Sequence, residues 1–513
     1  GKTLGMSMLY YFFNVRNESQ KLFEGLEISR NHELCEKWLN KWPTIFLTFK
    51  DIDGLDFASA YDQLVFTISD LYQKYSFLLE SEEIDEEDRK RFKLLKSGEG
   101  SKILVIRSLS LLMRLLENYY HKQMILLIDE YDVPIAKASS KGYYQQMLEI
   151  IRGMMSTALK DNTSLKFAVI TGCLQIAKES IFTGTNNFVT DTIANTGFNE
   201  YFGFTQQEVN KILEDTGTVQ YAKQMKEWYD GFVFGKRRDI YNHPWSITNF
   251  LDKKKFDAYW AATSSNSLVS RLIQTASSEI KEQMELLLQN KEIVVHFDEQ
   301  IIFEQLDQNE NAIWSLLLAS GYLKAVEVEY RGLLREKWYH LQITNLETMG
   351  MFMMMFRGWF DVSNSVYNRF VNALLGGNVR EMNAYMNEVA LATFSNFDSG
   401  THPSSKSQPE RFYHGFVLGL LVELRDRYQV KSNRESGYGR YDVMLILRNV
   451  AENAMILEFK VFDVEEEYSL QDTVKSALRQ IEEKQYDTKL LEAGISKNRI
   501  HHYGFAKVLI DGQ

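Results

Sequence analysis

Three short apolar runs, separated by long helical patterns, most constrain how this chain folds. The runs cover residues 44–49, 124–128 and 166–170, while residues 103–120 have apolar side chains at helical spacing. Short continuous apolar runs are typical of strands buried on both faces, which occur in parallel sheets covered by helices. We therefore predict that residues 1–203 form an α/β domain with a parallel sheet and flanking helices.

A segment rich in Gly, Ser and Pro divides the remaining chain. Residues 398–410 contain two of the five prolines and almost no apolar side chain, a composition typical of a linker. Residues 204–397 have mainly helical patterns, and Thr205 and Glu208 are predicted to form a capping box. Residues 411–513 are predicted to form a second α/β domain. Its expected elements are a helix over 411–427, strands over 440–447 and 454–461, a helix over 470–486 and a strand over 505–510.

Composition excludes several classes of protein. Cys35 and Cys173 are the only cysteines in 513 residues, which excludes a disulfide framework and a cysteine-rich zinc site and favours a reducing cytoplasm. The formal net charge of −11 argues against constitutive coating of nucleic acid, so any such contact must be local. The longest apolar run, residues 349–356, is too short to cross a membrane, and no signal peptide is evident. We expect a cytoplasmic protein without a membrane partner.

The first three residues match the end of a phosphate-binding loop. Gly1, Lys2 and Thr3 lead directly into an apolar helical pattern, as in the motif G-x-x-x-x-G-K-[ST]. In that motif backbone N–H groups surround the phosphates, the lysine contacts the β- and γ-phosphates, and the hydroxyl binds Mg²⁺. The preceding strand and the first half of the loop are missing, which predicts weak binding of ATP. The alternative is that three terminal residues match by chance.

Acidic residues follow the second apolar run. Asp129 and Glu130 stand where a Walker B strand has an aspartate that holds Mg²⁺ and a glutamate that polarises the attacking water. The alternative is that they mark the solvent end of a strand or cap the next helix. Thr171 ends the third run, where related ATPases have a polar sensor near the γ-phosphate; a hydroxyl that satisfies local backbone groups is equally compatible.

A second set of polar residues lies near the C-terminus. Asp442 lies in one predicted strand, and Glu458 and Lys460, two residues apart in the next, must share a face. If the strands pair, two carboxylates can bind Mg²⁺ or Mn²⁺ while the lysine orients or activates water beside a phosphate. Glu423 on the preceding helix and Gln480 on the following helix are candidate supporting residues. The alternative is an exposed strand with alternating polar side chains.

Over nearly its whole length the chain resembles bacterial AAA-ATPase-like proteins with a C-terminal PD-(D/E)XK nuclease domain. The matching segments are Gly-Lys-Thr-Leu at 1–4, Leu-Leu-Ile-Asp-Glu-Tyr-Asp at 126–132, Thr-Gly-Cys-Leu-Gln-Ile-Ala-Lys-Glu-Ser-Ile-Phe at 171–182, Trp-Tyr-Asp-Gly-Phe at 228–232, Ile-Tyr-Asn-His-Pro-Trp-Ser at 240–246, Phe-Tyr-His-Gly-Phe at 412–416, Ser-Asn-Arg-Glu-Ser-Gly-Tyr-Gly-Arg-Tyr-Asp at 432–442 and Leu-Glu-Phe-Lys at 457–460. The "PD" motif is Tyr441-Asp442 here, a variation that occurs in that superfamily.

The resemblance implies a P-loop ATPase of the AAA or STAND type, a helical lid or regulatory region, and a restriction-endonuclease-like end. Phosphate and Mg²⁺ roles are implied for Lys2, Thr3, Asp129 and Glu130. Metal-binding and catalytic roles are implied for Asp442, Glu458 and Lys460, with Gln480 in support.

Three hypotheses for function follow. In the first, ATP binding or hydrolysis in residues 1–203 controls a metal-dependent nuclease in residues 411–513, with DNA as the expected partner and self-association through the ATPase domain. In the second, the chain is a nucleotide-switched scaffold whose nuclease-like domain binds DNA or protein without cleavage. In the third, it is an ATPase with a structural C-terminal domain. The complete Asp442, Glu458 and Lys460 set favours the first, because binding alone does not require all three.

Overall fold

The computed structural model describes most of the chain as two compact units. One consists of residues 1–254 and 296–324, the other of residues 255–295 and 325–513. The described residues are 2–172, 189–191, 197–198, 201–234, 237–241, 243–261, 267–297, 309–359, 364–384, 419, 424, 427–436, 439–448, 452–462 and 467–507. Gly1, Glu423, the predicted linker and nearly all of the predicted helix 411–427 lie outside them. Among the described residues, none of the helices has the length and hydropathy needed to span a membrane.

A parallel sheet forms the core of the first unit. Its strands β1 (Thr44–Thr48), β2 (Met124–Asp129) and β3 (Leu165–Ile170) lie in the order β1-β2-β3. All three strands were predicted to within one residue at each end, and the prediction of a parallel sheet is confirmed. Every residue of β2 is buried, as expected for the central strand.

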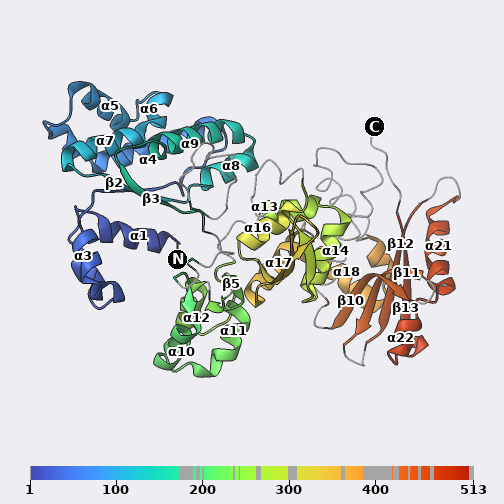
Figure 1. The fold of residues 1–513 in the computed structure, drawn as a ribbon. Helices are drawn as coiled ribbons and strands as arrows, with labels where there is room; N and C mark the ends of the chain where they lie inside the picture. The colour runs from blue at the N-terminus through green and yellow to red at the C-terminus, as the bar shows by residue number, and fades with distance from the viewer. Residues whose placement is uncertain are drawn as a thin grey trace. The chain divides into compact units, whose positions relative to one another are not determined.

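Helices cover both faces of this sheet (Figure 1). Helices α1 (Lys2–Phe13) and α3 (His32–Trp38) lie on one side, and α4 (Phe57–Lys74), α7 (Ser108–Tyr120) and α9 (Tyr144–Leu159) on the other. Met6 of α1 packs against Ile125 and Leu127 of β2, which fixes the start of α1 against the central strand. The predicted helix 103–120 is two helices, α6 (Lys102–Ile106) and α7, because Arg107 leaves helical geometry with φ −90° and ψ 3°.

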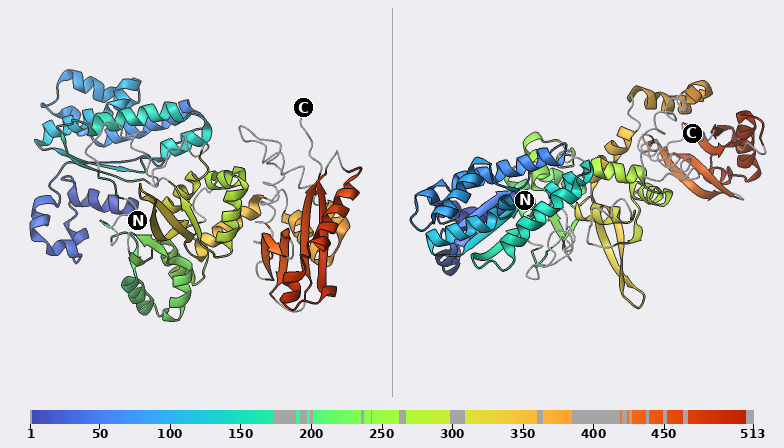
Figure 2. Two further views of the ribbon diagram at one scale, coloured as in Figure 1. Left: turned by 45° about the vertical axis from the view of Figure 1, so that its right-hand side comes forward. Right: turned by 90° about the horizontal axis from the view of Figure 1, so that it is seen from above.

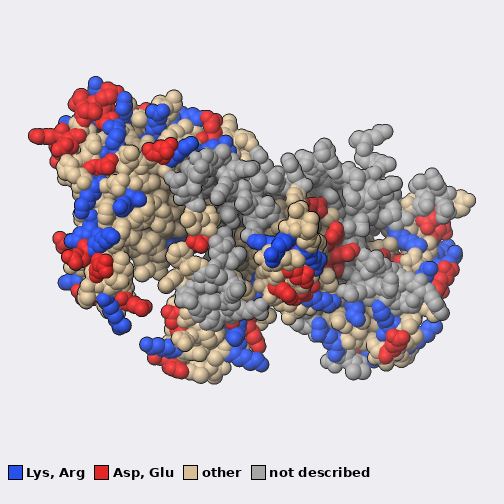
Figure 3. Space-filling model, viewed as in Figure 1, with Lys and Arg blue, Asp and Glu red and all other residues tan. Residues whose placement is uncertain are grey.

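An acidic segment forms the start of α5 (Glu86–Ser97). Asp85 caps this helix by accepting a hydrogen bond from the Asp88 N–H at 2.8 Å, and three acidic residues in the first turn suit the positive end of the helix dipole. Figure 3 shows acidic side chains gathered around α5. Asp88 itself is buried and receives two hydrogen bonds from the Arg114 guanidinium, at 2.7 and 3.0 Å. This pair attaches α5 to α7.

The middle of the chain contains small sheets as well as helices. The predicted capping box is confirmed, because Thr205 and Glu208 bond each other's backbone N–H at the start of α10 (Gln206–Asp215). The strands of this region were not predicted. One sheet has the order β4-β6-β5 and another the order β7-β9-β8. The strands are β4 (Phe204–Thr205), β5 (Phe232–Phe234), β6 (Arg237–Tyr241), β7 (Ile293–His296), β8 (Leu323–Arg331) and β9 (Glu336–Ile343). The helices are α11 (Ala222–Tyr229), α12 (Pro244–Lys253), α13 (Ser267–Thr275), α14 (Ser278–Leu288), α16 (Ala312–Ala319), α17 (Leu346–Trp359) and α18 (Asn364–Gly376).

A four-stranded mixed sheet forms the C-terminal part. Its strands lie in the order β10-β11-β12-β13, with β12 and β13 parallel and the other neighbours antiparallel. They are β10 (Tyr428–Ser436), β11 (Gly439–Leu447), β12 (Ala454–Val461) and β13 (Ile500–Lys507). Helices α21 (Leu470–Glu483) and α22 (Thr488–Glu492) lie between β12 and β13 in the sequence. The last strand begins at Ile500 and not at Phe505 as predicted, and the helix predicted over 470–486 ends at Glu483 as α21. Figure 2 shows α21 lying along one face of this sheet.

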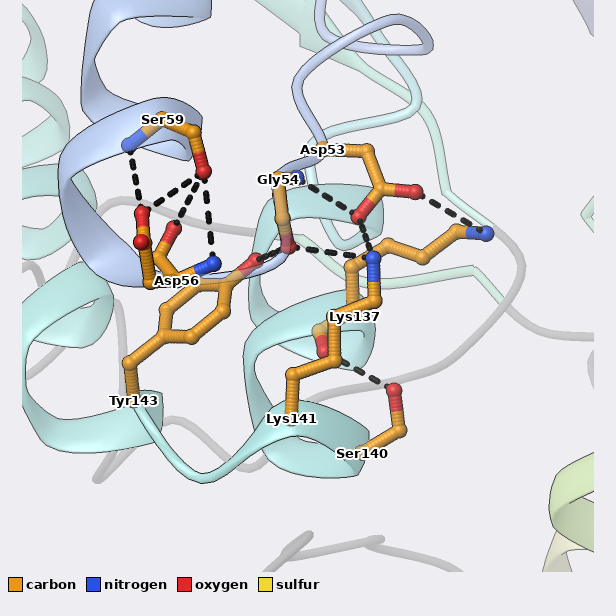
Figure 4. Close-up of polar contacts among 8 residues, drawn as sticks. All are labelled: Asp53, Gly54, Asp56, Ser59, Lys137, Ser140, Lys141 and Tyr143. Atoms are coloured by element: carbon orange, nitrogen blue, oxygen red, sulfur yellow. Dashed lines mark hydrogen bonds and ion pairs between the residues drawn. The ribbon is translucent and has the colours of Figure 1, made fainter.

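A polar cluster holds the segment after β1 against α8 (Val133–Lys141), at the edge where the parallel strands end (Figure 4). The Lys141 ammonium donates to Asp53 Oδ1 at 2.6 Å and to the Gly54 carbonyl at 3.0 Å. The Tyr143 hydroxyl donates to the same carbonyl at 2.9 Å. Because Gly54 passes directly over the start of α4, a Cβ atom there would lie 2.3 Å from the Ala60 nitrogen.

We expect Gly54→Ala to lower the free energy of unfolding by about 1–3 kcal/mol, because a backbone atom must move to admit the methyl group. Gly350→Ala in α17 is the matched control: nothing lies near its added Cβ, and alanine favours a helix. Thermal and urea unfolding of both variants would measure the difference. Equal stability of Gly54→Ala and the wild type would contradict the tight passage of this segment.

Candidate functional site

Asp129 and Thr171 meet at the edge where β2 and β3 end. The Thr171 hydroxyl donates to Asp129 Oδ1 at 2.5 Å, and the Thr171 N–H donates to the Ile128 carbonyl at 2.9 Å. Asp129 is 1% exposed, and its Oδ2 accepts no hydrogen bond from the residues that the structure describes. A buried carboxylate with one oriented oxygen and one unsatisfied oxygen is a suitable ligand for a divalent cation. These residues therefore fit Mg²⁺.

Lys2 and Glu130 lie close together beside this carboxylate. Lys2 Nζ is 3.6 Å from Glu130 Oε1, which joins the first turn of α1 to the end of β2. Glu130 has φ 56°, in the left-handed region that residues other than glycine rarely adopt. Such strain is frequent where a side chain must be aimed at a ligand. Thr3 has an exposed side chain and is not hydrogen-bonded to Asp129 in the described part of the chain.

Two further residues shape this edge and were given no role in the sequence analysis. Asp132 is 2% exposed, and a Cβ at Gly172 would lie 2.5 Å from its Oδ1 and 2.6 Å from the Tyr131 ring. Only glycine at position 172 lets the chain after Thr171 approach this closely. Asp132 and Gly172 lie in the matching segments 126–132 and 171–182, but the sequence motifs do not show that these segments touch.

Strand pairing brings Asp442 and Glu458 together in the second unit. Val443 lies opposite Leu457 in the antiparallel ladder of β11 and β12, so Asp442 and Glu458 follow as the next pair. The Asp442 N–H donates to Glu458 Oε2 at 3.3 Å, and the Phe459 N–H donates to Asp442 Oδ2 at 2.7 Å. Glu458 is 3% exposed. The two carboxylates are therefore held by backbone donors on adjacent strands.

Helix α21 supplies further polar groups to the same place. The Lys460 ammonium donates to Ser476 Oγ at 3.0 Å. The Gln480 amide donates to Glu458 Oε1 and, at 3.1 Å, to the Tyr486 hydroxyl. Ser476 and Gln480 share a helix face because they are four residues apart. Ser476 was missed by the sequence analysis, although its spacing from Gln480 is a usable signal.

The pKa of Glu458 is raised to about 8, first because burial penalises its charged form and second because Asp442 is a like charge. The Asp442 N–H, Lys460 and Gln480 oppose this shift. No group of three or more His, Cys, Asp or Glu side chains suited to a metal occurs within the described ranges. Asp442 and Glu458 therefore fit a hard cation that takes its remaining ligands from water, as Mg²⁺ does.

Comparison with protein families agrees with this division of sites. Residues 1–182 match the model of a predicted AAA-ATPase family, and residues 408–507 match the PD-(D/E)XK nuclease superfamily. The chain thus joins an AAA-ATPase-like segment to a PD-(D/E)XK nuclease-superfamily segment. This confirms the resemblance stated from the sequence motifs. The C-terminal match includes all of β10 to β13 and the Asp442–Glu458 pair.

Among curated proteins the chain is similar to an uncharacterized protein in the vnfD 5′ region of Azotobacter chroococcum. The two are 20% identical over 393 residues, which cover 73% of this chain and 67% of the relative. No solved structure matches the chain.

The raised pKa of Glu458 predicts a pH-dependent effect of Glu458→Gln on stability. A free glutamate loses its proton near about pH 4.3, whereas folded Glu458 keeps it to about pH 8. The contribution of Glu458 to the free energy of unfolding is therefore fully present below about pH 4.3, and it is lost as the pH rises to about 8. We expect the variant to gain Tm relative to the wild type between about pH 5 and pH 8, by a few degrees.

Thermal unfolding across this pH range would measure the gain, with Glu482→Gln on the exposed side of α21 as the control. Adding Mg²⁺ at pH 8 should raise the Tm of the wild type more than that of Glu458→Gln. A pH-independent difference between variant and wild type would contradict the shifted pKa.

Proposed function

We propose that residues 1–203 bind and hydrolyse ATP and that residues 411–513 are a metal-dependent nuclease whose activity the nucleotide state controls. PD-(D/E)XK nuclease domains act on nucleic acid, and AAA-ATPase-like domains generally use a nucleotide and a divalent metal. The single observation that carries the nuclease proposal is the joint position of Asp442, Glu458 and Lys460 on paired strands. DNA is the substrate proposed, residues 398–410 are the linker, and residues 204–397 are the lid or regulatory region.

At the nuclease site, Asp442 and Glu458 would hold Mg²⁺ or Mn²⁺, which supplies positive charge to the scissile phosphate and acidifies bound water. Lys460 would hold the attacking water: one of its N–H groups is used by Ser476 and the others remain for water or a phosphate oxygen. The water oxygen would form a bond to phosphorus and release a proton to solvent, while the bond from phosphorus to the leaving sugar oxygen breaks and that oxygen takes a proton from solvent. Gln480 fixes the Glu458 carboxylate for this task.

At the nucleotide site, Asp129 and Thr3 would hold Mg²⁺, with Thr171 orienting Asp129. Lys2 lies in the first turn of α1, where the helix dipole also favours phosphate. Glu130 would accept a proton from the water that attacks the γ-phosphate. We propose that Lys2 exchanges its contact with Glu130 for the phosphates when nucleotide arrives, which frees the carboxylate to act on water. Self-association would use this ATPase domain.

We expect Lys460→Ala to lower cleavage of DNA by about 10²-fold or more while leaving folding intact, because a positioned proton or charge partner contributes on that scale. Lys475→Ala is the matched control, since Lys475 is exposed on α21 and pairs with Asp472 at 3.4 Å. The measurement is cleavage of single- and double-stranded DNA with Mg²⁺ or Mn²⁺, with and without ATP. Cleavage that survives in Lys460→Ala would remove Lys460 from the mechanism.

If the protein binds DNA but does not cleave it under any of these conditions, the result would support a binding scaffold in place of a nuclease. A rate that is the same with and without ATP would contradict control by the nucleotide.

We expect Glu130→Gln to slow ATP hydrolysis by about 10²-fold or more and to retain bound ATP, because the amide cannot accept the proton of the attacking water. Phosphate release and binding of a fluorescent ATP analogue would measure the two effects. Glu149→Gln is the control, because Glu149 is exposed on α9. Unchanged turnover in Glu130→Gln would assign the proton acceptor elsewhere.

A further inference from the structure

The β8–β9 hairpin ends in an exposed apolar tip. Gly332 to Arg335 form the turn, and Leu333 is 100% exposed and Leu334 83% exposed. The right-hand view of Figure 2 shows the two strands extending side by side away from the neighbouring helices. Two adjacent leucines contribute nothing to the core at this position, and their exposure to water is unfavourable. A binding role accounts for them where a folding role does not.

Arginines flank the leucines and are held by aromatic rings. The Arg331 guanidinium carbon lies 4.4 Å from the centre of the Trp338 ring, and that of Arg335 lies 5.1 Å from the centre of the Tyr330 ring. Tyr330 is 56% exposed. Residues 329–337 carry three basic side chains and two acidic ones, so the tip has a small positive formal charge although the whole chain is negative.

A cross-strand network orients Arg331. Its Nε donates to Glu329 Oε2 at 2.6 Å, and Glu329 Oε1 is 2.6 Å from His340 Nε2. The other ring nitrogen of His340 contacts Glu292, and this hydrogen bond raises the pKa of His340. Within the described residues the two terminal nitrogens of Arg331 are not used in this network. The guanidinium is thus fixed at its base and keeps its outer donors for a ligand.

We propose that this hairpin tip binds duplex DNA, with Leu333 and Leu334 entering at a base step and Arg331 and Arg335 contacting the flanking phosphates. Apolar side chains between basic ones are the means by which proteins partly unstack a base step while holding the backbone. The proposal rests on the proposed function only in taking DNA as the partner. A lipid surface could also receive an apolar tip with basic flanks, and the experiment separates the two.

The test uses the full chain with Ca²⁺ in place of Mg²⁺, so that binding is measured without cleavage. The probe is a short duplex with 2-aminopurine beside a TA step, followed by fluorescence and anisotropy. We expect wild-type protein to raise the fluorescence, and Leu333→Ser/Leu334→Ser to abolish the rise and weaken binding about tenfold. Arg331→Ala/Arg335→Ala should reduce the slope of log affinity against log salt by about 2, because each phosphate contact contributes about 0.9.

Matched controls separate this surface from general effects. Leu22→Ser removes another exposed leucine, and Lys211→Ala/Lys223→Ala removes two exposed charges; both should bind as the wild type does. Hairpin variants that bind and unstack DNA as the wild type does would overturn the proposal. So would loss of binding to phosphatidylserine vesicles in the hairpin variants with DNA binding unchanged.

Cleavage with Mg²⁺, measured in parallel, tests the nuclease separately. Hairpin-dependent binding without any cleavage would contradict the nuclease and leave the hairpin proposal intact. Cleavage by the wild type, together with DNA binding that does not depend on the hairpin, would contradict only the hairpin proposal.

Discussion

Hydrogen bonding between β11 and β12 fixes Val443 opposite Leu457, and the whole C-terminal site follows from this register. A shift by one residue would turn Asp442 and Glu458 to opposite faces, because strand side chains alternate. The parallel pairing of β12 with β13 then requires a crossover, and α21 is the longer helix of that crossover. Its position over the sheet lets Ser476 and Gln480 reach Lys460 and Glu458. In the first unit, parallel register likewise brings Asp129 and Thr171 to one edge.

Both sites bury carboxylates, and different hydrogen bonds offset the unfavourable burial in each site. Asp129 receives a hydroxyl hydrogen bond on one oxygen, whereas Glu458 receives an amide and a backbone N–H, one on each oxygen. Burial of an ionised carboxylate is unfavourable unless hydrogen bonds or a cation balance it. Burial, and then the like charge of Asp442 beside it, raise the pKa of Glu458, so its proton is retained to higher pH. A cation that binds both carboxylates would replace that proton.

The sequence was sufficient to predict elements whose side chains are uniformly apolar. It was insufficient where pairing with a neighbouring segment determines the secondary structure. β2 was found because all of its residues are buried, and Glu458 with Lys460 because a two-residue spacing fixes a shared face. β13 was placed too late, since its first residues are Ile-His-His-Tyr-Gly and only pairing with β12 makes them a strand. The short strands β4 to β6 have too few residues for a periodic pattern. The contact of Gly172 with Asp132 joins residues 40 positions apart, and no local signal reports it.

The two lysines of the sites are held in different ways, and this bears on how each site acts. Lys2 lies 3.6 Å from a carboxylate, so part of its charge is already compensated before a phosphate arrives. Lys460 donates instead to a neutral hydroxyl; its charge also favours the ionised form of Glu458, and its other donors remain for substrate. Under the proposed functions, a phosphate at Lys2 would compete with a contact to a carboxylate, whereas a phosphate at Lys460 would compete with a hydrogen bond to a hydroxyl. The proposed nucleotide switch would thus need an exchange of partners at Lys2, whereas the groups of the proposed nuclease site already lie together.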